Sequence, residues 1–371
     1  MTTIVDGQAG ITFNDASVQG TAGYTGFRNR IINGAMVIDQ RNAGASGTGN
    51  ANYPVDRWFY FGSQTSKLTW QQNSGSVTPP TGFTNYLGAV SSSAYSITST
   101  DQFLFYQKIE GFNSSDFAWG TASAKSVTLS FWVYSSLTGT FGGSIQNSTA
   151  LRCYPFSFSV SSANTWTYVS IVIPGDTSGT WLTTNGVGVI VNFSLGTGTS
   201  YSATANAWTG TQFVTSVTGA TSVVGTSGAT FYITGVQLEQ GIVATPFERP
   251  LYSKQLADCQ RYYQMSYDIG TAPGTATTTG LFMFGFAING VNTGAGSIPF
   301  KVQMRTSPTI SYWDGAGNAS KVTNGSPTPT TNNVAPTSAP TMISTNWFVH
   351  PGQGTNGNSY NWIQYAASAE L

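Results

Sequence analysis

The stretch Val127-Thr-Leu-Ser-Phe-Trp-Val-Tyr134 decides the fold class of this chain. An extended strand would place apolar side chains at every second position on one face, namely those of Val127, Leu129, Phe131 and Val133. The opposite face would carry the side chains of Thr128, Ser130, Trp132 and Tyr134. A period of two over eight residues is typical of a β-strand that covers a core with one of its faces.

The same alternation recurs on both sides of this segment. It is found in Trp166–Ile173, which runs into the turn signal Pro174-Gly175, and again in Val187–Leu195 and Thr230–Leu238. Short alternating segments separated by turns favour two packed antiparallel sheets. We therefore predict an all-β protein with an antiparallel jelly-roll β-sandwich over residues 27–250.

Composition and charge exclude several classes of protein. The chain has 371 residues, 14 Lys and Arg against 14 Asp and Glu, and only 8% charged residues, where about 25% is usual. A neutral chain without a basic patch argues against nucleic-acid binding. The longest apolar run, Leu281–Ile288, is too short for membrane insertion. Aromatic residues make up 13% of the chain, enough to build a large core and to argue against disorder.

Residues 251–371 are predicted to form a connector helix and a second, smaller β domain. Ser253 would cap a helix over Lys254–Tyr263. The strand Leu281–Ile288 is apolar on both faces, so it lies inside a sandwich or under another subunit. Residues 327–336, polar and rich in proline, read as a loop.

Few residues are available for catalysis or metal binding. Cys153 and Cys259 lie far apart and outside any CxxC motif, so they are interpreted as free buried thiols and not as zinc ligands. His350 is the only imidazole, and no nucleophile-elbow motif accompanies it. We expect no catalytic residues, no metal site and no cofactor.

The acidic residues also fit a structural role better than a catalytic one. Asp39, Asp56, Glu239 and Glu248 lie close in sequence to Arg41, Arg57 or Arg249, or within short motifs that look structural. Hydrolysis of a glycoside requires two carboxyl groups that flank the scissile bond. No close pair of acids is visible in the sequence, so these residues are expected to fix loops through ion pairs and hydrogen bonds.

Carbohydrate binding requires fewer specialised groups than glycoside hydrolysis, because a flat aromatic ring and a few polar groups suffice to hold a sugar. The best candidates are aromatic residues beside polar, glycine-rich loops, together with two rings on the polar face of the first strand. These candidates are Tyr312, Trp313, Asp314, Asn318, Trp347, Asn356, Asn358, Tyr360, Trp132 and Tyr134. A subunit interface would explain Trp132 and Tyr134 equally well.

Residues 1–26 form a separate segment that is too small to hold a core. Ile11, Phe13 and Val18 supply its apolar positions. We expect a partner protein to hold this segment in place.

Several motifs together resemble tailed-bacteriophage tail-fibre proteins. The segment Gly10–Gln19 is similar to their N-terminal element, and 27–41 with Asp56-Arg-Trp58 is similar to the start of their β-sandwich domain. The later motifs are 173–181, 235–249, Cys259-Gln-Arg-Tyr-Tyr263, 303–308 and Ala369-Glu-Leu371. This resemblance implies a sandwich like those of carbohydrate-binding modules, a homotrimer, and a virion appendage.

The resulting hypothesis is a non-enzymatic tail fibre, assembled in the cytoplasm of the host bacterium. Residues 1–26 would dock it to other tail or baseplate proteins of the virion, and a host-surface glycan would be its external partner. Two alternatives remain open at this stage. One is a head-decoration, collar or baseplate protein that binds other virion subunits, and the other is a glycan depolymerase.

Overall fold

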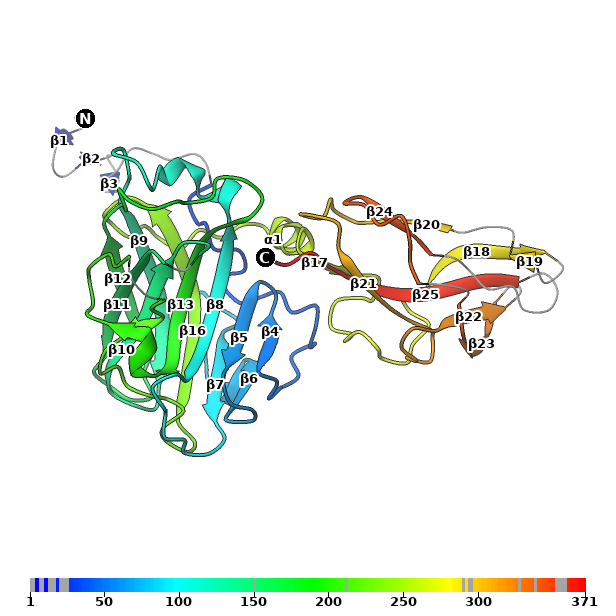
Figure 1. Ribbon diagram of the computed structural model, residues 1–371, viewed down its shortest axis with the longest axis horizontal. Coiled ribbons are helices and arrows are strands. Elements are labelled where there is room, and N and C mark those ends of the chain that lie inside the picture. The colour runs from blue at the N-terminus through cyan, green and yellow to red at the C-terminus, as the bar shows by residue number, and fades with distance from the viewer. Residues whose placement is uncertain are drawn as a thin grey trace.

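The computed structural model describes residues 4–6, 10–12, 18–19, 27–149, 151–210, 213–288, 291–292, 296–325, 328–336, 339–350 and 359–371. It shows an all-β protein, which confirms the predicted fold class. Figure 1 shows a β-sandwich at one end, an elongated smaller β unit at the other, and the helix α1 (Tyr252–Gln260) between them. This helix has nine residues, and no helix in the described part of the chain has the length and hydrophobicity to cross a bilayer.

Two antiparallel sheets form the sandwich. The six-stranded sheet has the order β11 (Cys153–Val160), β10 (Gly139–Gln146), β13 (Val187–Thr197), β8 (Gln102–Glu110), β5 (Trp58–Gly62) and β4 (Ala51–Val55). The five-stranded sheet has the order β12 (Thr167–Ile173), β9 (Val127–Ser135), β16 (Thr230–Gln240), β7 (Leu87–Ser91) and β6 (Leu68–Gln72). The four alternating segments of the sequence are thus β9, β12, β13 and β16.

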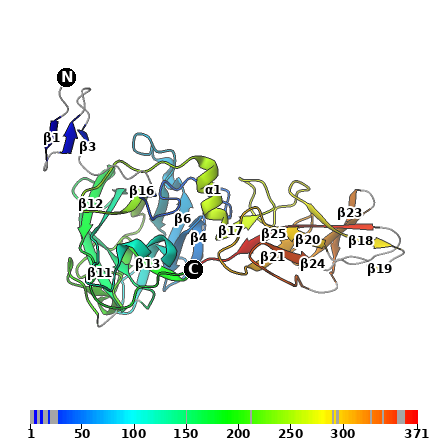
Figure 2. The ribbon, with the colours of Figure 1, turned by 90° about the horizontal axis from the view of Figure 1, so that it is seen from above.

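Short elements complete this part of the chain. They are η1 (Ser74–Ser76), η2 (Gly111–Asn113), η3 (Ser115–Phe117), η4 (Thr199–Tyr201) and the parallel pair β14 (Ser202–Ala203) and β15 (Ser216–Val217). The strands β1 (Ile4–Asp6), β2 (Gly10–Thr12) and β3 (Val18–Gln19) form a separate antiparallel sheet near the N-terminus (Figure 2). Ile11 lies on β2 and Val18 on β3, while Phe13 lies outside the described residues.

Aromatic side chains fill the space between the two sheets. Phe131 on β9 lies with its ring 5.1 Å from that of Phe158 on β11 and 4.9 Å from that of Phe193 on β13. The four apolar residues of β9 are fully buried, as the alternation predicted. Such edge-to-face pairs add about 0.5–1.5 kcal/mol each to the burial of the rings.

The smaller unit is organised around one long strand, β25 (Ser359–Ser368). β17 (Tyr263–Met265) and β21 (Thr309–Trp313) pair with its C-terminal half, and β18 (Phe282–Ile288) and β22 (Val322–Gly325) pair with its N-terminal half. Further strands are β19 (Val291–Asn292) and β23 (Pro329–Val334). The strands β20 (Gly296–Pro299) and β24 (Trp347–His350), which are far apart in sequence, form an antiparallel pair. Ile298, Met304, Phe348 and Ile363 are among its core residues.

Two local predictions for this region are wrong. The helix begins at Tyr252 after Leu251, and no side chain caps it, so Ser253 lies inside the helix; Gln260 is its last residue and Tyr263 already belongs to β17. Part of the predicted loop 327–336 is the strand β23, which pairs with β22. Pro329 is tolerated there because it is the first residue of the strand.

The junction between the two units is charged and largely buried. Glu370, which follows β25, forms ion pairs with Arg57 and with Arg41, the latter at 2.8 Å. The Arg57 guanidinium also lies 3.5 Å from the ring centre of Tyr262, directly after α1. Because Arg41 and Arg57 come from the sandwich, these contacts hold the end of β25 against it.

A second set of contacts crosses the same junction. Arg261 and Tyr262 both donate to the carboxylate of Glu110, which is buried at the end of β8. Arg305 donates to the carbonyls of Ala369 and Glu370 and also to that of Asn185 in the sandwich, at 2.8–2.9 Å. The two units are therefore joined by directed, charge-assisted hydrogen bonds.

Burial also affects acid–base behaviour at this junction. Desolvation raises the pKa of Asp56 to about 6, although Arg41 and the amide groups of Gln40 favour its charged form. Burial likewise raises the pKa of Tyr262 to about 12. Gln40 donates both to Asp56 and to the carbonyl of Tyr263, so the Asp56 carboxylate is tied to β17.

Glu370→Ala is predicted to destabilise the protein strongly. It leaves the guanidinium of Arg57, whose side chain is 2% exposed, without its carboxylate. Breaking a buried pair from one side costs about 3–5 kcal/mol. The free energy of unfolding in urea measures the loss.

Lys254→Ala is the control for this experiment. It removes an ion pair with Asp258 on the surface of α1, where the lysine side chain is 59% exposed, and should change stability by less than about 1 kcal/mol. Equal stability of the two variants would show that the ion pairs of Glu370 do not hold the junction.

Candidate functional site

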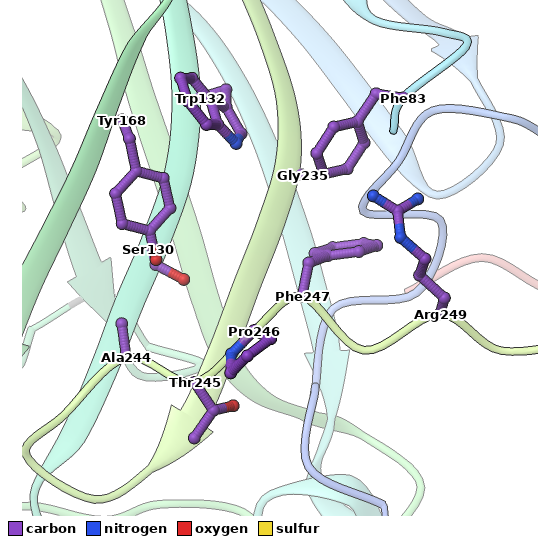
Figure 3. Close-up of a pocket in the computed structure, with 10 residues that line it drawn as sticks. All are labelled: Phe83, Ser130, Trp132, Tyr168, Gly235, Ala244, Thr245, Pro246, Phe247 and Arg249. Atoms are coloured by element: carbon purple, nitrogen blue, oxygen red, sulfur yellow. The ribbon is translucent and has the colours of Figure 1, made fainter. Parts of the chain in front are cut away.

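A cavity of about 480 Å³ opens on the outer face of the five-stranded sheet. Ten residues from β9, β12, β16 and two loops line it: Phe83, Ser130, Trp132, Tyr168, Gly235, Ala244, Thr245, Pro246, Phe247 and Arg249. We call this cavity the outer pocket. Figure 3 shows Trp132 and Tyr168 on one side of β16, and Phe83, Phe247 and Arg249 on the other.

The floor of the outer pocket is an irregularity in the pairing of β16 with β9. Thr234 pairs with Trp132 and Gln237 with Ser130, so β16 has one extra residue between these two pairs. Gly235 lies in this bulge with φ of 62°. A Cβ atom there would lie 2.6 Å from Phe83 and 3.1 Å from Trp132. Glycine therefore lets both rings approach the floor.

Residues 29–34 hold the bulge through hydrogen bonds to the backbone of β16. The side-chain amide of Asn29 donates to the carbonyl of Val236 at 3.1 Å and its oxygen accepts from the N–H of Leu238. The N–H of Val236 donates to the carbonyl of Gly34 at 2.9 Å. Backbone groups that the bulge removes from the ladder are thus satisfied, which the buried position requires.

The walls of the outer pocket are aromatic. Trp132 and Tyr168 are direct cross-strand neighbours with ring centres 5.3 Å apart. Opposite them, Phe83 and Phe247 meet edge to face at 5.2 Å. Tyr168 is 47% exposed, so its ring remains available to a ligand.

Two carboxylates, that of the buried Glu239 and that of the partly buried Glu248, fix the loop that closes the outer pocket. Glu239 accepts hydrogen bonds from the backbone N–H and the hydroxyl of Thr245. Glu248 accepts from the N–H groups of Arg28 and Asn29. This position of Glu239 and Glu248 confirms the expectation that they fix loops.

Asp39 and Asp56, the other two acidic residues considered in the sequence, also accept hydrogen bonds that fix loops. Asp39 accepts from the N–H groups of Asn42 and Gly44, and Asp56 accepts from Gln40 and Arg41. Cys153 and Cys259 are buried and form no disulfide with each other, as expected. In the part of the chain that the structure describes, no three His, Cys, Asp or Glu side chains form a metal-binding group.

The outer pocket offers binding chemistry. Its rings provide apolar faces, Arg249 provides five N–H donors, and none of its ten lining residues carries a carboxyl group. An apolar wall with a few placed polar groups is the usual composition of a small-molecule site.

Of the residues selected from the sequence, Trp132 lines this pocket. Tyr134 lies two residues along β9, but its ring stacks on that of Tyr232 at 5.3 Å and contacts Trp166 at 5.5 Å. The structure therefore gives Tyr134 a packing role beside the pocket.

The candidates in the smaller unit are arranged differently. Tyr312 is buried against His350, with ring centres 4.5 Å apart, and Trp313 contacts Tyr267. Asp314 is fully buried and accepts hydrogen bonds from Ala316 and Asn318. These contacts close the loop from within, so a structural role explains Tyr312, Asp314 and Asn318 better than a sugar site.

The remaining candidates lie near the far strands of the smaller unit. Trp347 begins β24 and is 38% exposed, and Tyr360 on β25 lies near Trp362. Asn356 and Asn358 lie outside the described residues. A binding role for Trp347 and Tyr360 stays a prediction.

Four of the nine lining residues that were not predicted from the sequence carry an aromatic ring or a charge. Tyr168 could have been found, because Val169 and Ile173 of β12 face the core and the alternation turns Tyr168 outward. Phe247 and Arg249 belong to the 235–249 motif. The sequence does not show that this motif folds back over the outer face of the sheet. Phe83 comes from a separate loop, and no sequence signal connects it with β9.

Comparisons with known proteins give no family for this chain. No protein-family model matches it, and no curated protein does. Solved structures resemble part of it. One is the enzymatically active domain of tailspike protein 4 of bacteriophage CBA120, with 14% identity and a TM-score of 0.31 over 57% of this chain and 21% of that one.

Two other similar structures are named for sugars. A putative sugar-binding protein from Bacteroides thetaiotaomicron has 14% identity and a TM-score of 0.33 over 58% of this chain and 100% of its own. The family 11 carbohydrate-binding module of a Clostridium thermocellum cellulase has 12% identity and a TM-score of 0.27 over 55% and 99%. Likenesses this remote assign neither a ligand nor a function.

Gly235→Ala is predicted to lower stability and to deform the outer pocket. A left-handed backbone costs an alanine about 1–2 kcal/mol, and the new methyl group also strikes Phe83. The control is Gly219→Ala, where φ is 79° and no atom lies within 4 Å of the added Cβ. Urea unfolding of both variants separates the collision from the backbone strain. Equal losses would mean that Phe83 moves aside freely.

Proposed function

We propose that this chain is a tail-fibre protein of a tailed bacteriophage that binds glycans on the host surface through the outer pocket, without cleaving them. The observation that carries the binding proposal is the pair of rings from Trp132 and Tyr168, held 5.3 Å apart on a rigid sheet and open to solvent on one side. The flat C–H face of a pyranose ring can stack on such a surface.

The preorganisation of the outer pocket supports binding. Trp132 and Tyr168 stand on strands, the floor is a hydrogen-bonded bulge, and the closing loop is fixed by Glu239 and Glu248. Little conformational entropy is then lost when a ligand binds. Stacking also does not depend on net charge, which suits a chain with equal numbers of acids and bases.

The non-enzymatic part of the proposal follows from the groups available. Glycoside hydrolysis uses two carboxyl groups about 5–10 Å apart on either side of the bond. The lining of the outer pocket has none, and the nearby Glu239 and Glu248 are used by backbone N–H groups.

The virion part of the proposal rests on the sequence motifs and on the shape of the chain. The elongated smaller unit, joined to the sandwich by a charged junction, suits a projecting appendage (Figure 1). Residues 1–26 would dock it to tail or baseplate proteins, and three copies would form the fibre.

Tyr168→Ala and Trp132→Ala are predicted to weaken glycan binding by about 30-fold or more, because ring truncation at a binding centre costs about 2 kcal/mol. The measurement is biolayer interferometry of the full chain on a panel of bacterial surface polysaccharides. Phe112→Ala removes an equally exposed ring that does not line the outer pocket, and should bind like the parent. Absence of binding by the parent chain to every polysaccharide would contradict the proposal.

Native mass spectrometry of the full chain tests the fibre proposal. We expect an assembly of three times the 39.2 kDa of one chain. A monomer at micromolar concentration would overturn the trimeric fibre.

A further inference from the structure

We infer that the ligand of the outer pocket is an acidic glycan, whose sugar carboxylate is bound by Arg249. This inference rests on the proposed function and narrows it to one class of ligand, the polysaccharides that contain sugar acids.

Arg249 is positioned by the aromatic wall of the pocket. Its guanidinium carbon lies 4.4 Å from the ring centre of Phe83 and 5.5 Å from that of Phe247. Figure 3 shows the guanidinium group beside the Phe83 ring, at the rim of the cavity. Stacking on aromatic rings orients the planar group and leaves its N–H edges for a partner.

No carboxylate of the described residues forms an ion pair with Arg249. Among the described arginines, Arg30, Arg41, Arg57, Arg152 and Arg261 pair with Asp or Glu. Arg28 and Arg305 form no ion pair, but their guanidinium groups donate to the hydroxyl of Thr245 and to backbone carbonyls, whereas that of Arg249 only contacts aromatic rings. An oriented guanidinium at the rim of an aromatic cavity is the arrangement that binds a carboxylate with two parallel hydrogen bonds.

The nearest acids do not compete for this role. Glu239 and Glu248 line no part of the pocket and accept hydrogen bonds from Thr245, Arg28 and Asn29. The Arg28 guanidinium donates to the hydroxyl of Thr245 at 3.1 Å, which places a second positive charge behind the same loop. Arg249 is the one charged residue among those that line the cavity, so the lining favours an anionic ligand.

A sugar acid fits both parts of the pocket. Its ring can stack on Trp132 and Tyr168, and Figure 3 shows the Arg249 guanidinium across β16 from these rings, where it would bind the carboxylate. A neutral sugar would offer Arg249 only hydroxyl acceptors, without the charge-assisted pair that a carboxylate forms.

The test compares each bound polysaccharide with its carboxyl-reduced form, in which carbodiimide and borohydride convert every carboxylate to a primary alcohol. We expect reduction to weaken binding of the full chain about tenfold or more, the effect of losing a charge-assisted pair. Arg249→Gln should bind the acidic form about tenfold more weakly than the parent does, and should bind the reduced form almost as well as the parent. Arg249→Lys keeps the charge but not the planar fork and should fall in between.

Lys254→Gln, which removes an exposed charge on α1, is the control and should keep the parent's preference. Equal binding of acidic and reduced forms, or an unchanged preference in Arg249→Gln, would overturn the inference. If neutral glycans bind and Tyr168→Ala abolishes that binding, the proposed function stands and only the acidic ligand is wrong. If no glycan binds at all, both fail.

Discussion

The bulge of β16 at Gly235 and Val236, with the hydrogen bonds that hold it, is the constraint on which the rest of the molecule depends. A bulge in a buried strand leaves backbone groups without ladder partners, and each unsatisfied group would cost about 1–3 kcal/mol. Residues 29–34 supply hydrogen-bond partners to the backbone groups of Val236 and Leu238. The same segment continues to Gln40 and Arg41, which contact β17 and Glu370, so one stretch of chain supports both the outer pocket and the junction.

Scarcity of charge explains how the two halves of the molecule are built. Aromatic rings stabilise the sandwich, while four of the few arginines, Arg41, Arg57, Arg261 and Arg305, gather where the units meet. Their hydrogen bonds give the junction a defined geometry, because charge-assisted hydrogen bonds are directional. Arg249 lies away from this junction, at the rim of the outer pocket. We infer that it binds the anionic group of a ligand there.

Much of the fold was predictable, because alternation is a local property. β9, β12, β13 and β16 and the buried row on β9 follow from the sequence, and so does the outward position of Trp132. The outer pocket was not predictable, since Phe83 and Arg249 approach Trp132 only through the bulge and the closing loop. The motifs at 56–58, 259–263 and 369–371 were visible in the sequence, but only the fold shows that they meet at one junction. The burial of Tyr312 and Asp314 depends likewise on β24 and on the loop that Asp314 closes.

The central claim is that a glycan binds on the outer face of the five-stranded sheet. A crystal structure of the full chain with an oligosaccharide released from a bound surface polysaccharide tests this most directly. We predict electron density for a sugar ring stacked over Trp132 and Tyr168, with the loop at Thr245–Arg249 in its present position. A well-ordered sugar bound only to the smaller unit, for example beside Trp347, with the outer pocket empty, would contradict the account.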